Sequence, residues 1–306
     1  IHLFLSQNYN IIPKLTIPNN FTHLLCGDVL PAVGVLQKLL NSMGAKLDVN
    51  GVFDSATFLA VIEFRLNHGF FIPSGYVDKD TWDCLLDANR IQLPIHDYID
   101  VCDITDSFFL KLINFIMGGD ASEAELASIK KISNKYTTTG GASNGIDNVI
   151  TGITMSASNL FLLRFRGHGS SGLMSLSGGR LEVSKNGDGS FLSLEDFDNS
   201  TITNSLMRLR KVFGPYGCVE LHHCSVAKGT RGRAFVSKLA DLWGVPVTAG
   251  LYPQIGGIAL FTYRLEGTTF TACPGGISLS EWCRRLPDFP NRSVIPTVPL
   301  DYTPAY

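Results

Sequence analysis

The chain lacks the features that mark several classes of protein. It has no apolar run of about eighteen residues, the minimum that a membrane-spanning helix needs. It has no basic excess, because 25 Lys and Arg stand against 27 Asp and Glu, so its charge does not point to nucleic acid or anionic lipid. It also lacks an internal repeat. Its 306 residues, 45% apolar and 17% charged, have a globular composition and are enough for two domains.

The cysteines indicate neither a metal site nor a disulfide-rich scaffold, because they are widely and irregularly spaced. Their odd number fits one free thiol with three disulfides in an exported protein. It fits seven reduced thiols equally well. We expect no cofactor. The seven residues are Cys26, Cys84, Cys102, Cys218, Cys224, Cys273 and Cys283.

Apolar residues at helical spacing predict three helices in residues 29–90, after an amino-terminal extension over residues 1–28. Each predicted helix has a residue at one end that favours a helix boundary. The pattern therefore predicts a compact helical module. The boundary residues are Gly44 after the first helix, Asp54 or Ser55 before the second, Gly69 after the second and Asp78 before the third.

The same stretch carries a series of short signatures. They are Val35-Leu36-Gln37, Val49-Asn50-Gly51-Val52-Phe53-Asp54, Ala60-Val61, Phe64, Gly75-Tyr76-Val77 and Thr81-Trp82. In this order and spacing they resemble the peptidoglycan-binding domain type 1 family. Asn50 stands where that family usually has Asp, and Arg65 where it often has Gln. The resemblance implies a partner that is peptidoglycan or a related glycan polymer, and a secreted, periplasmic or cell-wall location. A reused structural module is the alternative.

Residues 91–144 are expected to form a helical connector. Apolar patterns over residues 108–117 and 122–132 are typical of helices, and Ser122 can cap the second of them. Residues 137–145 are small and polar, which is typical of a linker, a lid or a processing site.

From residue 145 to 306 strand-like and helix-like segments alternate. This alternation predicts a three-layer α/β sandwich with a largely parallel sheet, so the whole chain is an α+β protein of two domains. Strands are predicted over residues 159–165, 172–176, 218–221 and 245–249, with a hairpin over 258–265 and 268–272. Helices are predicted over residues 194–213, capped by Ser193 and stopped by Gly214-Pro215, and over 232–243, ended by Gly244.

Two of the predicted strands stop at reactive side chains. Residues 159–165 lead to His168, and residues 217–221 lead to Cys224. If the strands are parallel neighbours about 4.8 Å apart, both side chains open into the crevice at the carboxyl edge of the sheet. A thiol and an imidazole there can act as nucleophile and base. The backbone N–H groups of Gly169 and Cys224 are candidates to hold an oxyanion.

An apolar strand ending in His-Gly, followed by a second one ending in Cys, resembles the caspase–gingipain superfamily of cysteine peptidases. The run Cys224-Ser225-Val226-Ala227-Lys228-Gly229 is closest to an uncharacterised bacterial branch of it. The caspase signature Gln-Ala-Cys-x-Gly is absent, because two histidines precede Cys224. The resemblance implies a caspase-like fold and a dyad of His168 and Cys224 that cleaves peptide or amide bonds, without implying a side-chain specificity.

Residues near the dyad are candidates for a substrate pocket, although structural packing explains them as well. Strand alternation places the two adjacent histidines on opposite sides of the chain. A zinc site built from the dyad and these histidines is a further alternative, but adjacent ligands without a second spaced pair are atypical. The candidate pocket residues are His222, His223, Arg166 and Ser225.

Residues 184–195 resemble a calcium-binding EF-hand loop, with Asn186, Asp188 and Glu195 as candidate ligands. Ser184 stands where such loops usually have Asp, and the preceding segment is typical of a strand. A glycine-rich turn that leads into a capped helix explains the same residues.

The sequence thus predicts a cell-wall-targeted cysteine hydrolase. Its substrate would be a peptide or protein, either the stem peptides of the wall or an envelope or target-cell protein, and an antibacterial effector has this layout of binder and cutter. The alternative is a catalytically silent wall-binding protein with an adhesive or structural role.

Overall fold

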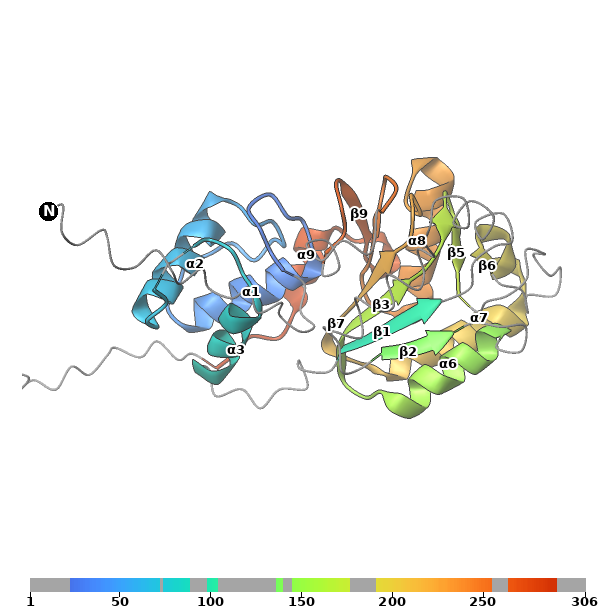
Figure 1. Ribbon diagram of the computed structural model, residues 1–306, viewed down its shortest axis with the longest axis horizontal. Coiled ribbons are helices and arrows are strands. Elements are labelled where there is room, and N and C mark those ends of the chain that lie inside the picture. The colour runs from blue at the N-terminus through green and yellow to red at the C-terminus, as the bar shows by residue number, and fades with distance from the viewer. Residues whose placement is uncertain are drawn as a thin grey trace, which may run out of the picture.

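The computed structural model describes residues 23–71, 74–88, 98–103, 136–139, 145–176, 191–254 and 264–290. Within these ranges a helical module lies at one end of the molecule and a six-stranded sheet with its helices lies at the other (Figure 1). None of the helices in these ranges is long and apolar enough to cross a membrane.

The amino-terminal module, residues 29–88, contains the three predicted helices. Asp54 caps the second, because its carboxylate accepts a hydrogen bond from the Thr57 N–H at 2.8 Å. Asp78 accepts one from the Thr81 N–H at 2.8 Å at the start of the third. The helices are α1 (Pro31–Ser42), α2 (Ser55–Asn67) and α3 (Lys79–Ala88).

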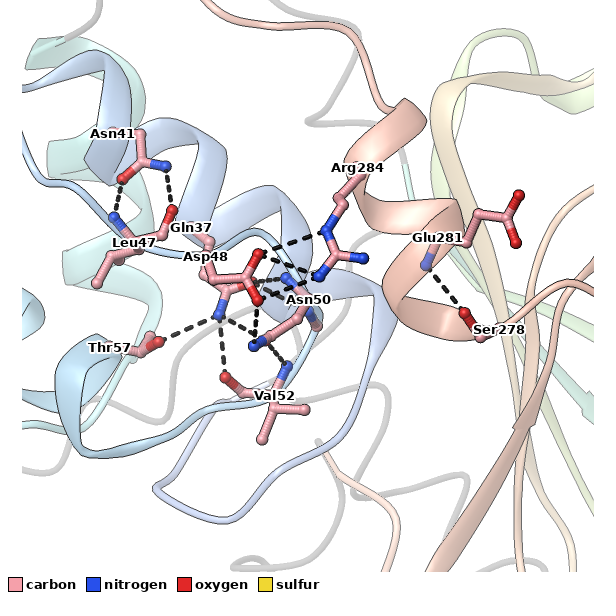
Figure 2. A network of polar contacts seen from close by, with 11 residues as sticks. Gln37, Asn41, Leu47, Asp48, Asn50, Val52, Thr57, Ser278, Glu281 and Arg284 are labelled. Carbon is pink, nitrogen blue, oxygen red and sulfur yellow. Dashed lines mark hydrogen bonds and ion pairs between the residues drawn. The ribbon is translucent and has the colours of Figure 1, made fainter.

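A buried glutamine holds the turn between α1 and α2 (Figure 2). The Gln37 side-chain oxygen accepts hydrogen bonds from the N–H groups of Asn50 and Gly51, both at 3.0 Å. Its amide nitrogen donates to the Val52 carbonyl at 3.0 Å. The Asn50 side-chain oxygen accepts from the Val52 N–H at 2.8 Å. An aspartate oxygen can do the same, so Asn50 keeps the turn that the resembled family builds with Asp.

Arg65, the other departure from that family, also finds several partners inside the module. Its guanidinium donates to the Tyr76 carbonyl at 3.1 Å, to the Asp78 carboxylate at 3.2 Å and to the Thr81 hydroxyl. It also lies over the Phe70 ring. Both departures therefore preserve the local structure of the module.

The main sheet confirms the prediction of a largely parallel arrangement. Its strand order is β2-β1-β3-β7-β8-β9, and each neighbouring pair is parallel except β8 with β9. A small antiparallel sheet lies beside it. The main strands are β1 (Tyr98–Asp103), β2 (Tyr136–Thr139), β3 (Leu160–Arg166), β7 (Phe213–His222), β8 (Val247–Gly250) and β9 (Thr269–Ala272). The small sheet has β4 (Gly169–Ser170), β5 (Leu173–Ser175) and β6 (Phe191–Ser193).

Three helices share a hydrophobic core with the main sheet: α6 (Gly145–Ser156), α7 (Ser200–Met207) and α8 (Gly229–Trp243). The alternate strand residues Leu163 and Phe165 belong to this core, and the Phe165 ring stacks on Trp243. We call it the sheet core. α8 ends at Gly244, which has the left-handed conformation that suits a helix C-terminus.

The core of the amino-terminal module, which we call the module core, continues into the main sheet. It includes Phe161 and Leu162 of β3 as well as Tyr216 and Cys218 of β7. The Trp82 ring meets the Phe161 ring edge-on at 6.3 Å between centroids. The module is therefore packed against the amino-terminal part of the central strands.

The last described helix, α9 (Leu279–Arg285), also joins the two regions. Cys283 is fully buried and lies against Gly34 of α1, where a Cβ atom would come within 2.4 Å of the Cys283 sulfur. Arg284 reaches from α9 to Asp48, at 3.2 Å between nitrogen and carboxylate oxygen (Figure 2).

Three sequence predictions in the α/β region were wrong. Residues 91–144 are not solely a helical connector, because they supply β1 and β2 to the main sheet, and Thr137–Thr139 belong to β2 rather than to a loop. Long-range pairing decides such short strands, and local patterns do not record it. The predicted helices over residues 108–117 and 122–132, most of the predicted strand over 258–265, and calcium candidates Asn186 and Asp188 lie outside the described residues.

The single helix predicted over residues 194–213 was also wrong. Short 3-10 turns, Leu194–Asp198 and Arg208–Lys211, flank the eight-residue α7. Ser193 caps the first turn as predicted, but the Asn199 side chain caps a new helix. Gly214-Pro215 do not stop a helix; they lie in β7, where the register with β3 is irregular. An irregular pairing tolerates proline, which has no N–H to donate.

Candidate functional site

The two residues predicted to form a dyad follow neighbouring strands. β3 and β7 are parallel, and Arg166 lies opposite His222 at their carboxyl ends. His168 and Cys224 come two residues after these paired positions, and both are partly exposed. The structure therefore brings both residues to one edge of the sheet, where open α/β folds bind ligands.

Cys224 begins a tight turn that leads from β7 to α8. Its sulfur donates a hydrogen bond to the Gln254 carbonyl at 3.4 Å. The next residue, Ser225, has a positive φ of 55° and donates its N–H to the Tyr252 carbonyl at 3.0 Å. The segment after β8 thus holds the turn that carries the thiol.

His168 sits where the chain leaves β3 for the small antiparallel sheet. Its N–H donates to the Ser175 hydroxyl at 2.9 Å, and its carbonyl accepts from the Ser175 N–H at 2.8 Å. Gly169, the candidate for oxyanion binding, is the first residue of β4 and lies opposite Met174. The backbone of His168 is therefore bound to Ser175 of β5 through both its N–H and its carbonyl.

The four candidate pocket residues differ in access to solvent. His222, His223 and Arg166 are buried, whereas Ser225 is partly exposed. Of these four side chains, Ser225 is therefore the one that is accessible to solvent, whereas the other three lie within the protein. The adjacent histidines have different partners, Glu220 for His222 and Ser175 for His223.

His222 belongs to a buried network of charges. Its Nε2 donates to the Glu220 carboxylate at 2.9 Å, and its Nδ1 accepts from the Arg166 guanidinium at 3.3 Å. This pattern requires a neutral ring with the proton on Nε2. Burial, together with the charge of Arg166, lowers the pKa of His222 to about 4.

Asp100 of β1 balances the arginines of this network. Its carboxylate lies 2.9 Å from the Arg164 guanidinium and 3.1 Å from that of Arg166, and all three side chains are buried. Burial alone would raise the pKa of Asp100, but the two arginines outweigh it and hold that pKa below its usual value. The sequence prediction missed Asp100 and Glu220. Two arginines at alternate positions of an apolar strand were the available signal, because buried charges need partners.

A cavity of about 330 Å³ lies at the seam between the amino-terminal module and the sheet. The Asp28 carboxylate pairs with the Arg264 guanidinium there at 2.7 Å. Burial raises the pKa of Asp28 despite this pairing. Both regions therefore contribute charged groups to the cavity. Its lining residues are Gly27–Leu30, Glu220, Arg264, Leu265 and Gly267–Thr269.

The described residues do not contain a group of three or more His, Cys, Asp and Glu side chains placed to hold a metal ion. Glu195, the calcium candidate within the described ranges, forms an ion pair with Arg231. All seven cysteines lie in these ranges and all are free thiols. The zinc and calcium alternatives thus receive no support from the residues that the structure describes.

Comparison with known proteins identifies one part of the chain. Residues 30–85 match the family described as "Putative peptidoglycan binding domain", which agrees with the resemblance of the three-helix module and indicates association with the cell wall. Comparison with curated proteins and with solved structures gave no match. For the α/β region, the structure shows a mostly parallel sheet. The chemistry of this region stays a prediction.

Proposed function

We propose that this protein is a cysteine hydrolase of peptide or amide bonds that its amino-terminal module brings to the cell wall. The observation that carries the proposal is the register of β3 and β7, which ends both strands at one edge with His168 and Cys224 beyond it. The match of residues 30–85 supports the targeting step. The caspase-like assignment rests on the His-Gly and Cys positions together with the mostly parallel sheet.

The proposed reaction uses the two side chains in turn. His168 takes the thiol proton, and the Cys224 sulfur forms a bond to the carbonyl carbon of the scissile amide. The backbone N–H groups of Gly169 and Cys224 hold the oxyanion, and the amine leaves with the proton from His168. Water then hydrolyses the thioester, which releases the carboxylate and restores the thiol. The substrates are stem peptides of the wall or an envelope or target-cell protein.

One observation favours the alternative of a catalytically silent wall-binding protein with an adhesive or structural role. The Cys224 thiol donates its proton to the Gln254 carbonyl, and a proton engaged with a backbone oxygen is not at the same time passed to a general base. The hydrolase therefore needs this bond to open when substrate binds.

Product analysis separates the two functions. Purified sacculi and a peptide library are incubated with the parent, Cys224→Ala and His168→Ala proteins, and the products are identified by mass spectrometry. The hydrolase predicts new products with the parent and their loss in both variants. Equal product patterns from the parent and Cys224→Ala proteins would leave the silent wall-binding protein.

Thiol labelling gives a second readout that needs no substrate. An activated Cys224 should react with iodoacetamide well below pH 8, and His168→Ala should remove this reactivity. Exposed Cys26 is an internal reference within the same chain. Buried Cys273 and Cys283 should stay unlabelled in the folded protein, because burial raises the pKa of each to about 12. Labelling of Cys224 no faster than Cys26 would contradict an activated thiol.

A further inference from the structure

A buried pair of side chains, Ser175 and His223, lies directly beneath the backbone of His168. The Ser175 hydroxyl accepts the His168 N–H at 2.9 Å, and the Ser175 N–H donates to the His168 carbonyl at 2.8 Å. His223 Nε2 lies 3.0 Å from the Ser175 carbonyl. A carbonyl oxygen only accepts, so His223 carries its proton on Nε2. These contacts form one chain from His223 through Ser175 to His168.

The two glycines that flank His168 allow this close approach. A Cβ atom on Gly167 would lie 2.4 Å from the Ser175 hydroxyl and 3.3 Å from His223 Nε2. One on Gly169 would lie 2.8 Å from the His223 Cβ. Real Cβ atoms essentially never come as near as 2.4 or 2.8 Å, so another residue at either position would clash with these two side chains.

The His223 side chain is not accessible to a substrate. It is 0% exposed, and Ser175 is 3% exposed. Burial lowers the pKa of His223 to about 3, so the ring stays neutral near neutral pH. A buried neutral imidazole with its one proton donated to a backbone carbonyl cannot exchange protons with a ligand. Its effect on His168 passes through Ser175 and through its packing against the flanking glycines.

We infer that Ser175 and His223 are positioning residues that fix the His168 backbone, and thereby its imidazole, relative to the Cys224 thiol. This inference rests on the proposed function and names residues that the two short motifs do not explain. The pair joins the turn that carries Cys224 to the turn that carries His168. A histidine immediately before the nucleophile thus serves the base instead of the substrate.

The test uses three substitutions in the full chain. Two of them remove a hydrogen-bonding group, and the third keeps one. Ser175→Ala removes the hydroxyl that accepts the His168 N–H, and His223→Phe keeps a ring but removes the donor. His223→Gln keeps a side-chain N–H for the Ser175 carbonyl. Ser205→Ala is the matched control, since Ser205 is also a buried serine bonded to a distant partner, the Asp147 carboxylate.

We expect Ser175→Ala and His223→Phe to lower kcat by on the order of tenfold to a hundredfold, with KM changed much less, because displacement of a catalytic group has effects of this size. The pH midpoint for alkylation of Cys224 should move upward in both variants. His223→Gln should recover most of both quantities, and Ser205→Ala should leave them at the parent values. A purely structural role would leave kcat and the alkylation midpoint of the folded variants unchanged, which would overturn the inference.

Hydrogen exchange distinguishes failure of this inference from failure of the proposed function. The His168 amide should exchange slowly in the parent and faster in Ser175→Ala, whatever the protein catalyses. Equal exchange in both proteins would overturn the positioning role even if Cys224 is active. The other outcome is slow exchange of the His168 amide in a parent protein that gives no Cys224-dependent products. That result would overturn the proposed function, and Ser175 and His223 would then have no catalytic role. If His223→Phe does not fold, Ser175→Ala carries the test, because it removes a single oxygen.

Discussion

The sheet core and the module core differ in which regions of the chain supply their residues. The sheet core consists of residues between Ile99 and Ala272, all from the α/β region. The module core begins at Leu24 but takes in Phe161 and Leu162 from β3, and it extends to Phe289. The amino-terminal module is therefore packed onto the α/β region, because its core includes residues of two central strands. A module packed in this way cannot move as a freely tethered unit.

The largest expected effect comes from the joint between the cores. Trp82 is 0% exposed and contacts Phe161 of β3. Trp82→Ala should lower the free energy of unfolding by about 3–5 kcal/mol, the usual cost of such a truncation. The matched change in the sheet core, Trp243→Ala, should cost a similar amount. Because the regions share a core, each variant should unfold in one transition by urea titration followed with probes in both regions. Two separate transitions would show that the module and the sheet unfold independently.

The buried charges of the sheet should matter far more than the exposed charges between the regions. Asp100→Ala leaves Arg164 and Arg166 buried without their carboxylate, and such a loss costs about 3–5 kcal/mol. Asp48→Ala removes an exposed ion pair with Arg284 and should cost below about 1 kcal/mol. Urea unfolding of the two variants measures the difference. Equal losses of stability would mean that the ion pair between Arg284 and Asp48 stabilises the packing of α9 on the module more than an exposed pair normally does.

Acid should weaken the α/β region through its adjacent histidines. The pKa values of His222 and His223 fall to about 4 and about 3 in the folded protein, against 6.5 for an ordinary histidine. Below pH 6.5 the unfolded chain binds protons that the folded chain does not, so stability falls as pH drops toward 4. Each histidine contributes up to about 1.4 kcal/mol per pH unit.

Urea titrations at a series of pH values between 7 and 4 measure this slope. His222→Gln and His223→Gln should each make the slope shallower, because neither glutamine takes up a proton. A slope that is unchanged in both variants would contradict the burial of neutral rings at these positions.

The smallest changes in stability are expected at two helical glycines, and they should have opposite signs. Gly152 of α6 has open space where a Cβ atom would lie, so Gly152→Ala should stabilise the protein by about 0.5–1 kcal/mol. Gly34 of α1 faces Cys283, so Gly34→Ala should instead destabilise by about 1–3 kcal/mol through overpacking against α9. Thermal unfolding of both variants gives the sign of each change. A stabilising Gly34→Ala would show that α9 packs less tightly on the module than the structure describes.

Local patterns predicted those elements whose boundaries are written in adjacent residues. Asp54 and Asp78 cap helices where the sequence indicates, and Gly244 ends α8 as expected. They failed for β1 and β2, because a short strand is stabilised by its neighbours in the sheet. They failed again around Pro215, where the pairing of β7 with β3 prevailed over the local turn signal.

The candidate site was likewise predicted in part. The sequence predicted that His168 and Cys224 would end two apolar strands, and the order and direction of β3 and β7 agree. It did not predict that His223 is sealed beneath the His168 turn, or that Asp100 balances two arginines. Those facts depend on which strands become neighbours, and a pattern along one segment carries no information about the segment beside it.

The helical module, its turn residues and the positions of His168 and Cys224 after apolar strands could thus be predicted from the amino-acid sequence. The packing of the module on the sheet and the partners of the buried charged and histidine side chains could not. Helix caps and hydrophobic periodicity act within a few residues, so they are recorded in short stretches of sequence. Burial and charge pairing act between residues that are brought together by folding, such as Trp82 with Phe161.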